Sequence, residues 1–150
     1  MTDLLEPGGF RDASVVVARD EHGLIAVLSA PFPQHGGEYL FLPGGRREAG
    51  EDALKCAQRE LREEAGITAT QWHPLGAFLL SMSSQARVHL FAAEVVHCGT
   101  QELTDTEEGF TLQWWPLAEV IGAAQQGRFL LQGGPLALLL AQQHWALQPV

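Results

Sequence analysis

The order of the expected elements predicts an α+β fold, with helices packed on the faces of a mixed β-sheet. Short apolar runs typical of strands fill the first part of the chain, one strongly patterned helix follows, and further strands and two apolar helical segments come last. With 150 residues, 46% of them hydrophobic, the chain can bury a core of its own. Because no repeat or linker-like tract divides it, we expect residues 1–150 to form one domain.

The segments before the patterned helix follow from local signals. Residues 1–12 are expected to be an irregular lead-in, and the turn signal at 20–23 predicts a hairpin between its flanking strands. Residues 30–38 contain two prolines and two glycines and are predicted to form a loop. The Pro43-Gly44-Gly45 step is expected to make a tight turn that lets the backbone approach a ligand. The strands predicted in this part of the chain are 13–18, 24–28 and 39–42.

The central helix is predicted over residues 52–64. Ala53, Ala57 and Leu61 recur every four residues and form an apolar stripe. Asp52 is of the type that begins a helix, and Gly66 is of the type that ends one, because glycine readily adopts a positive φ.

The remaining elements follow the helix in order. Pro116 is expected to open a helix to about residue 125, because proline is tolerated in a first turn. Gly133-Gly134-Pro135 is expected to begin a last helix that runs to about residue 145. The predicted buried face of that last helix is Leu136, Leu139, Leu140 and His144. The strands predicted in this half are 77–80, 87–96 and 110–115.

The last turn of the central helix carries an unfavourable concentration of negative charge. Glu60, Glu63 and Glu64 lie three and four residues apart and therefore project from one side. Like charges at this spacing repel, and the helix dipole is negative at the same end. Arg59 and Arg62 could neutralise the acids as part of a solvated face. The alternative is a site for a hard cation such as Mg²⁺, which prefers oxygen ligands.

The spacing around this helix resembles the Nudix box, the signature of the Nudix hydrolase (MutT-like) family. The pattern is G-x5-E-x7-R-E-U-x-E-E-x-G-U, where U is apolar. The resemblance implies an α/β/α sandwich and an enzyme, dependent on Mg²⁺ or Mn²⁺, that cleaves a nucleoside diphosphate linked to another group. The matching residues are Gly45, Glu51, Arg59, Glu60, Leu61, Glu63, Glu64, Gly66 and Ile67.

The resemblance also implies roles for individual residues. Glu60 and Glu64 would be the main metal ligands, with Glu63 as a ligand of a second metal or as a group that orients water. The backbone carbonyl of Gly44 would be a further ligand. Glu51 would pair with Arg59, and this pair would fix the glutamates, although a simple tie between loop and helix is compatible with the same pairing.

Residues outside the box complete the expected site. Family members often supply a catalytic glutamate from a loop, and Glu108 is our choice for the general base because of its place before the two tryptophans Trp114 and Trp115; a solvated loop acid is the alternative. Arg46 and Arg87 are candidates for contacting phosphate. Tyr39 is a candidate for stacking on a nucleobase, with core packing as its alternative.

The downstream segments RVHLF and TEEGFTLQWWPLAE, followed by Gly127-Arg128-Phe129, resemble the ADP-ribose pyrophosphatase branch of the family. Two features depart from that branch: residues 81–84 stand where a proline is often found, and the N-terminal extension that builds many of its dimers is missing. Because of the resemblance in these downstream segments, and despite the two departures, ADP-ribose or a related nucleotide sugar is the first substrate that we expect. A nucleoside triphosphate pyrophosphohydrolase is the alternative within the enzymes, and a nucleotide-sensing module without turnover is the alternative of another class.

Composition limits the partners. The formal charge of −9 argues against binding of a nucleic-acid polymer, which relies on basic residues. Five of the nine basic residues fall between Gly45 and Ile67, which suits a small phosphorylated ligand. Cys56 and Cys98 have no metal-binding spacing, and together with the lack of a signal peptide or a membrane-spanning run they indicate a cytoplasmic protein. The apolar last helix and the paired tryptophans are compatible with a homodimer, and the oligomeric state stays open.

Overall fold

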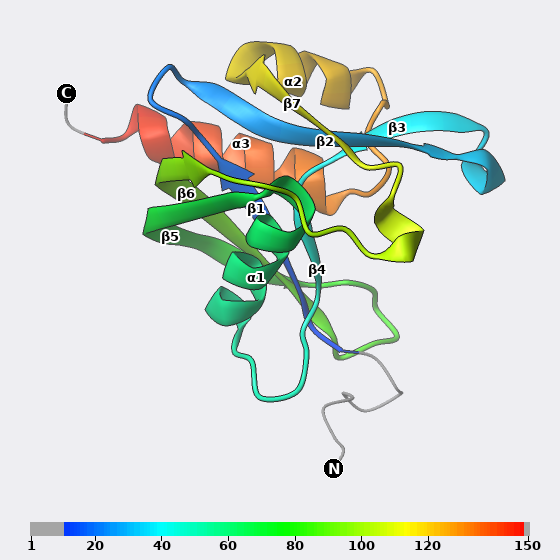
Figure 1. The fold of residues 1–150 in the computed structure, drawn as a ribbon. Helices are drawn as coiled ribbons and strands as arrows, with labels where there is room; N and C mark the ends of the chain where they lie inside the picture. Colours follow the sequence, from blue (N-terminus) through cyan, green and yellow to red (C-terminus); the bar gives the residue numbers. More distant parts are fainter. Residues whose placement is uncertain (1–10, 149–150) are drawn as a thin grey trace.

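A computed structural model of the chain describes residues 11–148 and confirms the α+β class (Figure 1). The lead-in expected at 1–12 therefore lies almost entirely outside the described residues. Two short 3-10 helices, η1 (Pro33–His35) and η2 (Asp105–Glu107), interrupt the connections. The strands and α-helices among residues 11–148 are, in chain order, β1 (Ala13–Ala18), β2 (Leu24–Phe32), β3 (Gly37–Phe41), β4 (Gly44–Arg46), α1 (Ala53–Ala65), β5 (Ile67–Leu79), β6 (Arg87–Cys98), β7 (Thr111–Pro116), α2 (Leu117–Gln125) and α3 (Gly133–Ala146).

The described strands form two sheets. The larger one has the order β4-β1-β6-β5 and is mixed, because β1 and β6 run parallel while the other pairs are antiparallel. The smaller one, β3-β2-β7, is antiparallel throughout. The mixed sheet that the sequence predicts is thus accompanied by a second sheet.

The sheets lie between two helical layers, with α1 on one side and α2 and α3 on the other (Figure 1). The alternation of β1 makes this arrangement possible, because successive side chains of a strand point to opposite faces. Val16 packs in the cluster that contains Ala57 and Leu61 of α1, whereas Val17 packs with Val120 of α2 and Leu138 of α3. One strand therefore anchors both helical layers.

The predicted hairpin between the first two strands is wrong. The turn itself forms, since Asp20 accepts hydrogen bonds from the backbone N–H groups of His22 and Leu24 at 2.9 and 2.8 Å. The strands on either side belong to different sheets, and only an isolated bridge from Arg19 to Ile25 joins them. Both edges of β1 are occupied by β4 and β6, and both edges of β2 by β3 and β7, so neither strand has an edge free for the other.

The loop predicted at 30–38 is also wrong, because β2 extends through Pro31 to Phe32 and returns through η1 into β3. Proline is tolerated there because β7 pairs with β2 only as far as Ser29. Beyond that point β2 has a neighbour on the β3 side alone, and a residue without an N–H costs no ladder hydrogen bond on the open side.

In the second half of the chain, the structure differs from two further predictions, the start of a strand and the buried face of the last helix. Strand β5 begins at Ile67, immediately after α1, instead of at residue 77. In α3 the buried residues are Gly134, Ala137, Leu138 and Ala141. Of the predicted buried face, Leu136 and Leu140 pack partly buried against the core, whereas Leu139 is 52% exposed, so the prediction is wrong for Leu139. Small residues face the sheet because the helix lies close to it: a Cβ on Gly133 would contact Val15 and Val88.

Candidate metal site

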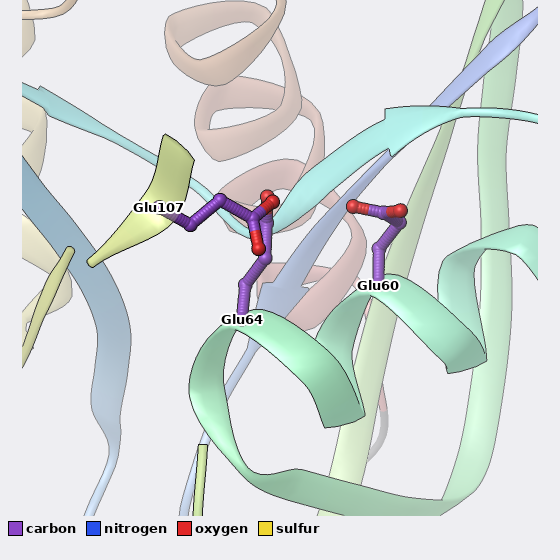
Figure 2. Close-up of side chains that lie close together, drawn as sticks. All are labelled: Glu60, Glu64 and Glu107. Atoms are coloured by element: carbon purple, nitrogen blue, oxygen red, sulfur yellow. The ribbon is translucent and has the colours of Figure 1, made fainter. Parts of the chain in front are cut away.

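Helix α1 presents its glutamates in a fixed direction because both of its ends are capped. The Asp52 side chain accepts a hydrogen bond from the backbone N–H of Lys55 at 2.8 Å, and Gly66 ends the helix with a φ of 70°. Ala57 and Leu61 are fully buried against the sheet. This burial fixes the rotation of the helix and turns Glu60 and Glu64 toward β4 and the loop that carries η2 (Figure 2).

Three carboxylates converge at this point, Glu60 and Glu64 from α1 and Glu107 from η2 (Figure 2). One oxygen atom of each lies within 4.8 Å of the others. Glu60 and Glu64 are only 8% and 5% exposed. These are the two residues that the sequence predicts as the main metal ligands, and the third carboxylate comes from a segment more than forty residues further along the chain.

The loop contributes Glu107 to the group, whereas Glu108, the residue chosen from the sequence, is exposed and lies outside it. A capping box places Glu107: its side chain accepts a hydrogen bond from the backbone N–H of Thr104 at 3.1 Å, and the Thr104 side chain accepts one in return from the backbone N–H of Glu107. Glu108 follows as the C-terminal residue of this turn. The Thr-x-x-Glu pattern at 104–107 was the sequence signal that distinguishes the two neighbours.

Burial and mutual repulsion make the ionised form of the grouped carboxylates unfavourable when no cation is bound. Burial raises the pKa of Glu64 to about 9, helped by the negative charges of Glu60 and Glu107 and opposed by a hydrogen bond from the backbone N–H of Gly44. Burial also raises the pKa of Glu60, although Arg59 opposes the rise. A bound divalent cation reverses this situation, because it stabilises the ionised carboxylates.

Two glycines let the backbone come close to these carboxylates. The tight turn expected at Pro43-Gly44-Gly45 does not form, because Gly44 and Gly45 pair with β1 as strand β4. The expected close approach does occur. A Cβ on Gly45 would lie 2.5 Å from a carboxylate oxygen of Glu60, and a Cβ on Gly44 would lie 2.3 Å from the backbone oxygen of Ser14. The Gly44 N–H donates to Glu64 at 2.9 Å.

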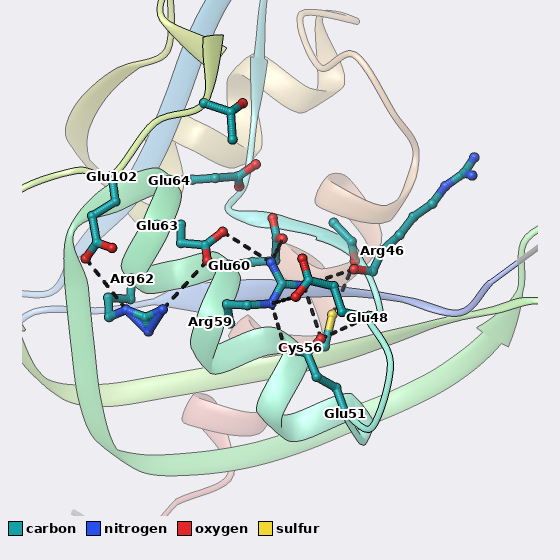
Figure 3. Close-up of polar contacts among 12 residues, drawn as sticks. Arg46, Glu48, Glu51, Cys56, Arg59, Glu60, Arg62, Glu63, Glu64 and Glu102 are labelled. Carbon is teal, nitrogen blue, oxygen red and sulfur yellow. Dashed lines mark hydrogen bonds and ion pairs between the residues drawn. The ribbon is translucent and has the colours of Figure 1, made fainter. Parts of the chain in front are cut away.

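Arg59 ties the glutamates to the loop before the helix (Figure 3). Its guanidinium donates to Glu51 at 2.6 and 3.1 Å, to Glu60, and to Glu63 at 3.2 Å. A further hydrogen bond reaches the backbone oxygen of Arg46 at 3.0 Å. These contacts raise the pKa of Arg59 and, through the hydrogen bonds that Glu51 accepts, lower the pKa of Glu51. Arg59 is therefore placed to orient the carboxylates, as the pairing predicted from the sequence requires.

The other residues predicted for the site lie around this network or away from it. Glu63 is bound by Arg59 and is not one of the three grouped carboxylates. The side chain of Arg46 extends away from the glutamates (Figure 3). Arg87 opens β6, where its backbone N–H donates to Asp12 at 3.0 Å, and the Tyr39 hydroxyl donates to the backbone oxygen of His35 at 2.6 Å. The structure thus gathers the glutamates and Arg59, whereas the side chains of Arg46, Arg87 and Tyr39 form no hydrogen bond or ion pair with Glu60, Glu64 or Glu107 among residues 11–148.

The donor set fits a hard divalent cation. Mg²⁺ and Mn²⁺ favour carboxylate oxygens, and three such groups lie close enough together to share one ion. No basic side chain other than Arg59 makes an ion pair with Glu60, Glu64 or Glu107 among residues 11–148, so most of this negative charge is left for a cation to neutralise. The fold and the site together define a carboxylate centre with the donor set of a cation site, on a loop–helix–loop segment of an α/β/α sandwich.

A comparison with known protein families identifies the family of this chain. The NUDIX domain family matches residues 9–132, most of the chain. The chain belongs to the NUDIX family. Among curated relatives it is 30% identical over 122 residues to the ADP-ribose pyrophosphatase of Mycobacterium tuberculosis (strain ATCC 25618 / H37Rv), which covers 79% of this chain and 58% of the relative. It is also 36% identical over 52 residues to the 8-oxo-dGTP diphosphatase of Proteus vulgaris, which covers 35% of this chain and 46% of that protein.

The chain thus spans little more than half of the first relative's length and less than half of the second's. Among solved structures, one described as an ADP compounds hydrolase superposes with a TM-score of 0.79 at 21% identity, covering 91% of this chain and 73% of that one. This likeness supports the fold.

Within residues 11–148, no helix combines the length and apolar character that a bilayer crossing requires.

Proposed function

We propose that the chain is a hydrolase, dependent on Mg²⁺ or Mn²⁺, that cleaves the pyrophosphate bond of a nucleoside diphosphate linked to another group. The convergence of Glu60, Glu64 and Glu107 is the observation that carries the proposal. ADP-ribose or a related nucleotide sugar is the favoured substrate, because the relative with the longer alignment of the two is an ADP-ribose pyrophosphatase. We further propose that residues 1–150 act as one NUDIX domain.

Glu60 and Glu64 would hold the cation with Glu107, and the carbonyl of Gly44 is a further candidate ligand. When bound, the cation neutralises the phosphate oxygens and lowers the pKa of an attacking water. In the hydrolysis one phosphorus–oxygen bond forms with water and the bond to the bridging oxygen breaks, and the bridging oxygen leaves with the proton that water gives up. We propose that Glu107, which lies beside Glu60 and Glu64, or Glu63, which Arg59 binds, orients that water or accepts its proton.

Further properties follow from the same proposal. A small nucleotide is a better partner than a nucleic-acid polymer for a chain with a formal charge of −9. Both cysteines are free, with Cys56 buried and Cys98 exposed, which suits a reducing compartment such as the cytoplasm.

A nucleoside triphosphate pyrophosphohydrolase is the second candidate, supported by the likeness to the 8-oxo-dGTP diphosphatase over the segment that the two chains share. The two candidates share the carboxylate centre and differ in what is attached to the diphosphate. A substrate panel therefore separates them.

The test is to incubate the chain with Mg²⁺ and ADP-ribose, nucleotide sugars, dinucleoside polyphosphates and nucleoside triphosphates, and to identify the products by chromatography. We expect nucleoside monophosphate from ADP-ribose, and a loss of turnover of roughly a thousandfold or more in Glu64→Gln, because a removed cation ligand disables the chemical step. Preference for triphosphates with release of pyrophosphate would establish the second candidate. Saturable binding without any product would establish a sensing module instead.

A further inference from the structure

A groove lies on the side of α1 that faces away from Glu60. It has a volume of about 350 Å³, and it is formed between α1 and the start of β5. Arg62 follows Glu60 by two residues, which places it about 200° around the helix. The residues that line this groove include Lys55, Gln58, Arg59 and Arg62 of α1 and Thr68 and Trp72 of β5.

The groove gathers positive charge in a strongly acidic chain. Three of the nine lysine and arginine residues line it, and no aspartate or glutamate does. The chain as a whole has a formal charge of −9. A hollow lined by one sign of charge concentrates ligands of the opposite sign, so this groove favours an anion that the rest of the surface repels.

Two of the three cations are available to a ligand. The ammonium group of Lys55 has no ion pair or hydrogen bond within residues 11–148, and the side chain is exposed. Arg62 forms ion pairs with Glu63 and Glu102, each at 3.7 Å. Both distances are too long for hydrogen bonds, so the N–H donors of Arg62 are not satisfied by these two glutamates. Arg59 is fully engaged with the glutamates, which neutralise its charge, so the attraction for an anion comes from Lys55 and Arg62.

Trp72 supplies a rigid aromatic surface beside these cations. Its indole N–H donates to the backbone oxygen of Ala69 at 2.9 Å, and its ring packs edge-on against Phe91 with the centroids 6.2 Å apart. These two contacts fix the ring, which stays partly exposed. A fixed indole next to a lysine and an arginine is the combination that recognises a planar ring joined to a phosphate.

We propose that this groove binds a small phosphorylated molecule with a planar ring, of the nucleoside monophosphate class, at a site separate from the carboxylate centre. The phosphate contacts Lys55 and Arg62, and the ring lies against Trp72. The exposed side chains of Gln58 and Thr68 add neutral hydrogen-bonding groups at the rim. The site places a ligand directly behind the helix that carries the metal ligands, and it does not depend on which substrate is hydrolysed.

The test is calorimetric titration of the full chain with AMP and, separately, with inorganic phosphate, in EDTA so that the carboxylate centre holds no metal. We expect saturable AMP binding and weaker phosphate binding. Lys55→Glu should weaken AMP binding by about tenfold or more, because a charge-assisted contact is replaced by repulsion. Gln58→Glu should also weaken it, because a negative charge is added beside the phosphate. Gln142→Glu makes the same change at an exposed position in α3 and should leave the affinity unchanged. Glu64→Gln should also bind AMP as the wild type does.

The chain offers an independent readout, because Lys55 is its only lysine. AMP should slow the acetylation of Lys55 by acetic anhydride but not that of the N-terminal amine, as followed by peptide mass spectrometry. The proposal is overturned if the wild type shows no saturable AMP binding, if Lys55→Glu binds as tightly as the wild type, or if Glu64→Gln abolishes binding. Phosphate binding as tight as that of AMP would contradict the role given to Trp72.

Discussion

At the scale of single residues, the adjacent acids Glu107 and Glu108 have different surroundings. The first takes part in the capping box with Thr104 and reaches the other two carboxylates, whereas the second is exposed. A one-residue difference in a surface loop therefore separates a candidate functional group from a solvated one. The distinction depends on backbone hydrogen bonds and not on residue type.

This difference gives a matched pair of variants. Glu107→Gln should lower kcat by about tenfold or more and weaken Mg²⁺ activation, because a grouped carboxylate is lost. Glu108→Gln makes the same chemical change one residue away and should stay within about twofold of the wild type in steady-state kinetics with ADP-ribose. If Glu108→Gln were the impaired variant, the placement of the loop would be wrong.

At the scale of elements, strand β4 lies so close to helix α1 and strand β1 that an added methyl group on either of its glycines would overlap a neighbour. The nearest atoms to a Cβ on Gly45 belong to the end of the Glu60 side chain, which can move. The nearest atom to a Cβ on Gly44 is the backbone oxygen of Ser14 in β1, which cannot move without shifting the strand. The absence of a side chain at Gly45 therefore allows the observed position of the Glu60 carboxylate, and its absence at Gly44 allows β4 to pair with β1.

We predict that Gly45→Ala keeps the fold and loses most of its Mg²⁺-dependent activity, because Glu60 is displaced. Gly44→Ala should instead lower the melting temperature, with a loss of stability of about 1–3 kcal/mol typical of overpacking. Gly37→Ala, where a Cβ meets nothing within 4 Å, is the control and should change neither property much. Thermal melts beside activity assays check all three variants, and an active, stable Gly45→Ala would contradict the proximity of β4 to Glu60.

The tie between the loop and α1 predicts a dependence of stability on pH. The pKa of Glu51 is lowered mainly by hydrogen bonds from Arg59, with burial opposing. The stability that Glu51 contributes is therefore fully present above about pH 4.5, its ordinary pKa, and is lost as the pH falls through the lowered value in the folded state. Urea unfolding in EDTA should show that Glu51→Gln costs more stability at pH 6 than at pH 3. A difference independent of pH would rule out the ionised pair.

At the scale of the whole molecule, the sequence predicted what local signals determine. The bounds of α1 follow from Asp52 and Gly66, and the closeness of Glu60 to Glu64 follows from one helical turn. Strand pairing was not predictable in this way. The run 13–18 does form a strand, but its partners β4 and β6 lie far along the chain, and no local pattern names them.

The same dependence on long-range contacts explains why the third carboxylate of the candidate site was not predicted from the sequence. Glu107 joins Glu60 and Glu64 only because η2 folds back over the C-terminal end of α1, where the backbone N–H of Glu102 donates to the oxygen of Glu63 at 2.7 Å. The predicted substrate-binding candidates, Arg46 and Arg87 for phosphate and Tyr39 for a nucleobase, depend on the same kind of long-range placement, and their roles stay predictions.

The central claim is that Glu60, Glu64 and Glu107 together hold a divalent cation. The most direct measurement is the anomalous scattering of Mn²⁺ in crystals of the chain soaked with that ion. We predict a strong anomalous peak among the three carboxylates in the wild type and its loss in Glu64→Gln. Wild-type crystals in which Mn²⁺ binds elsewhere, or in which these three carboxylates point apart with no peak between them, would contradict the account.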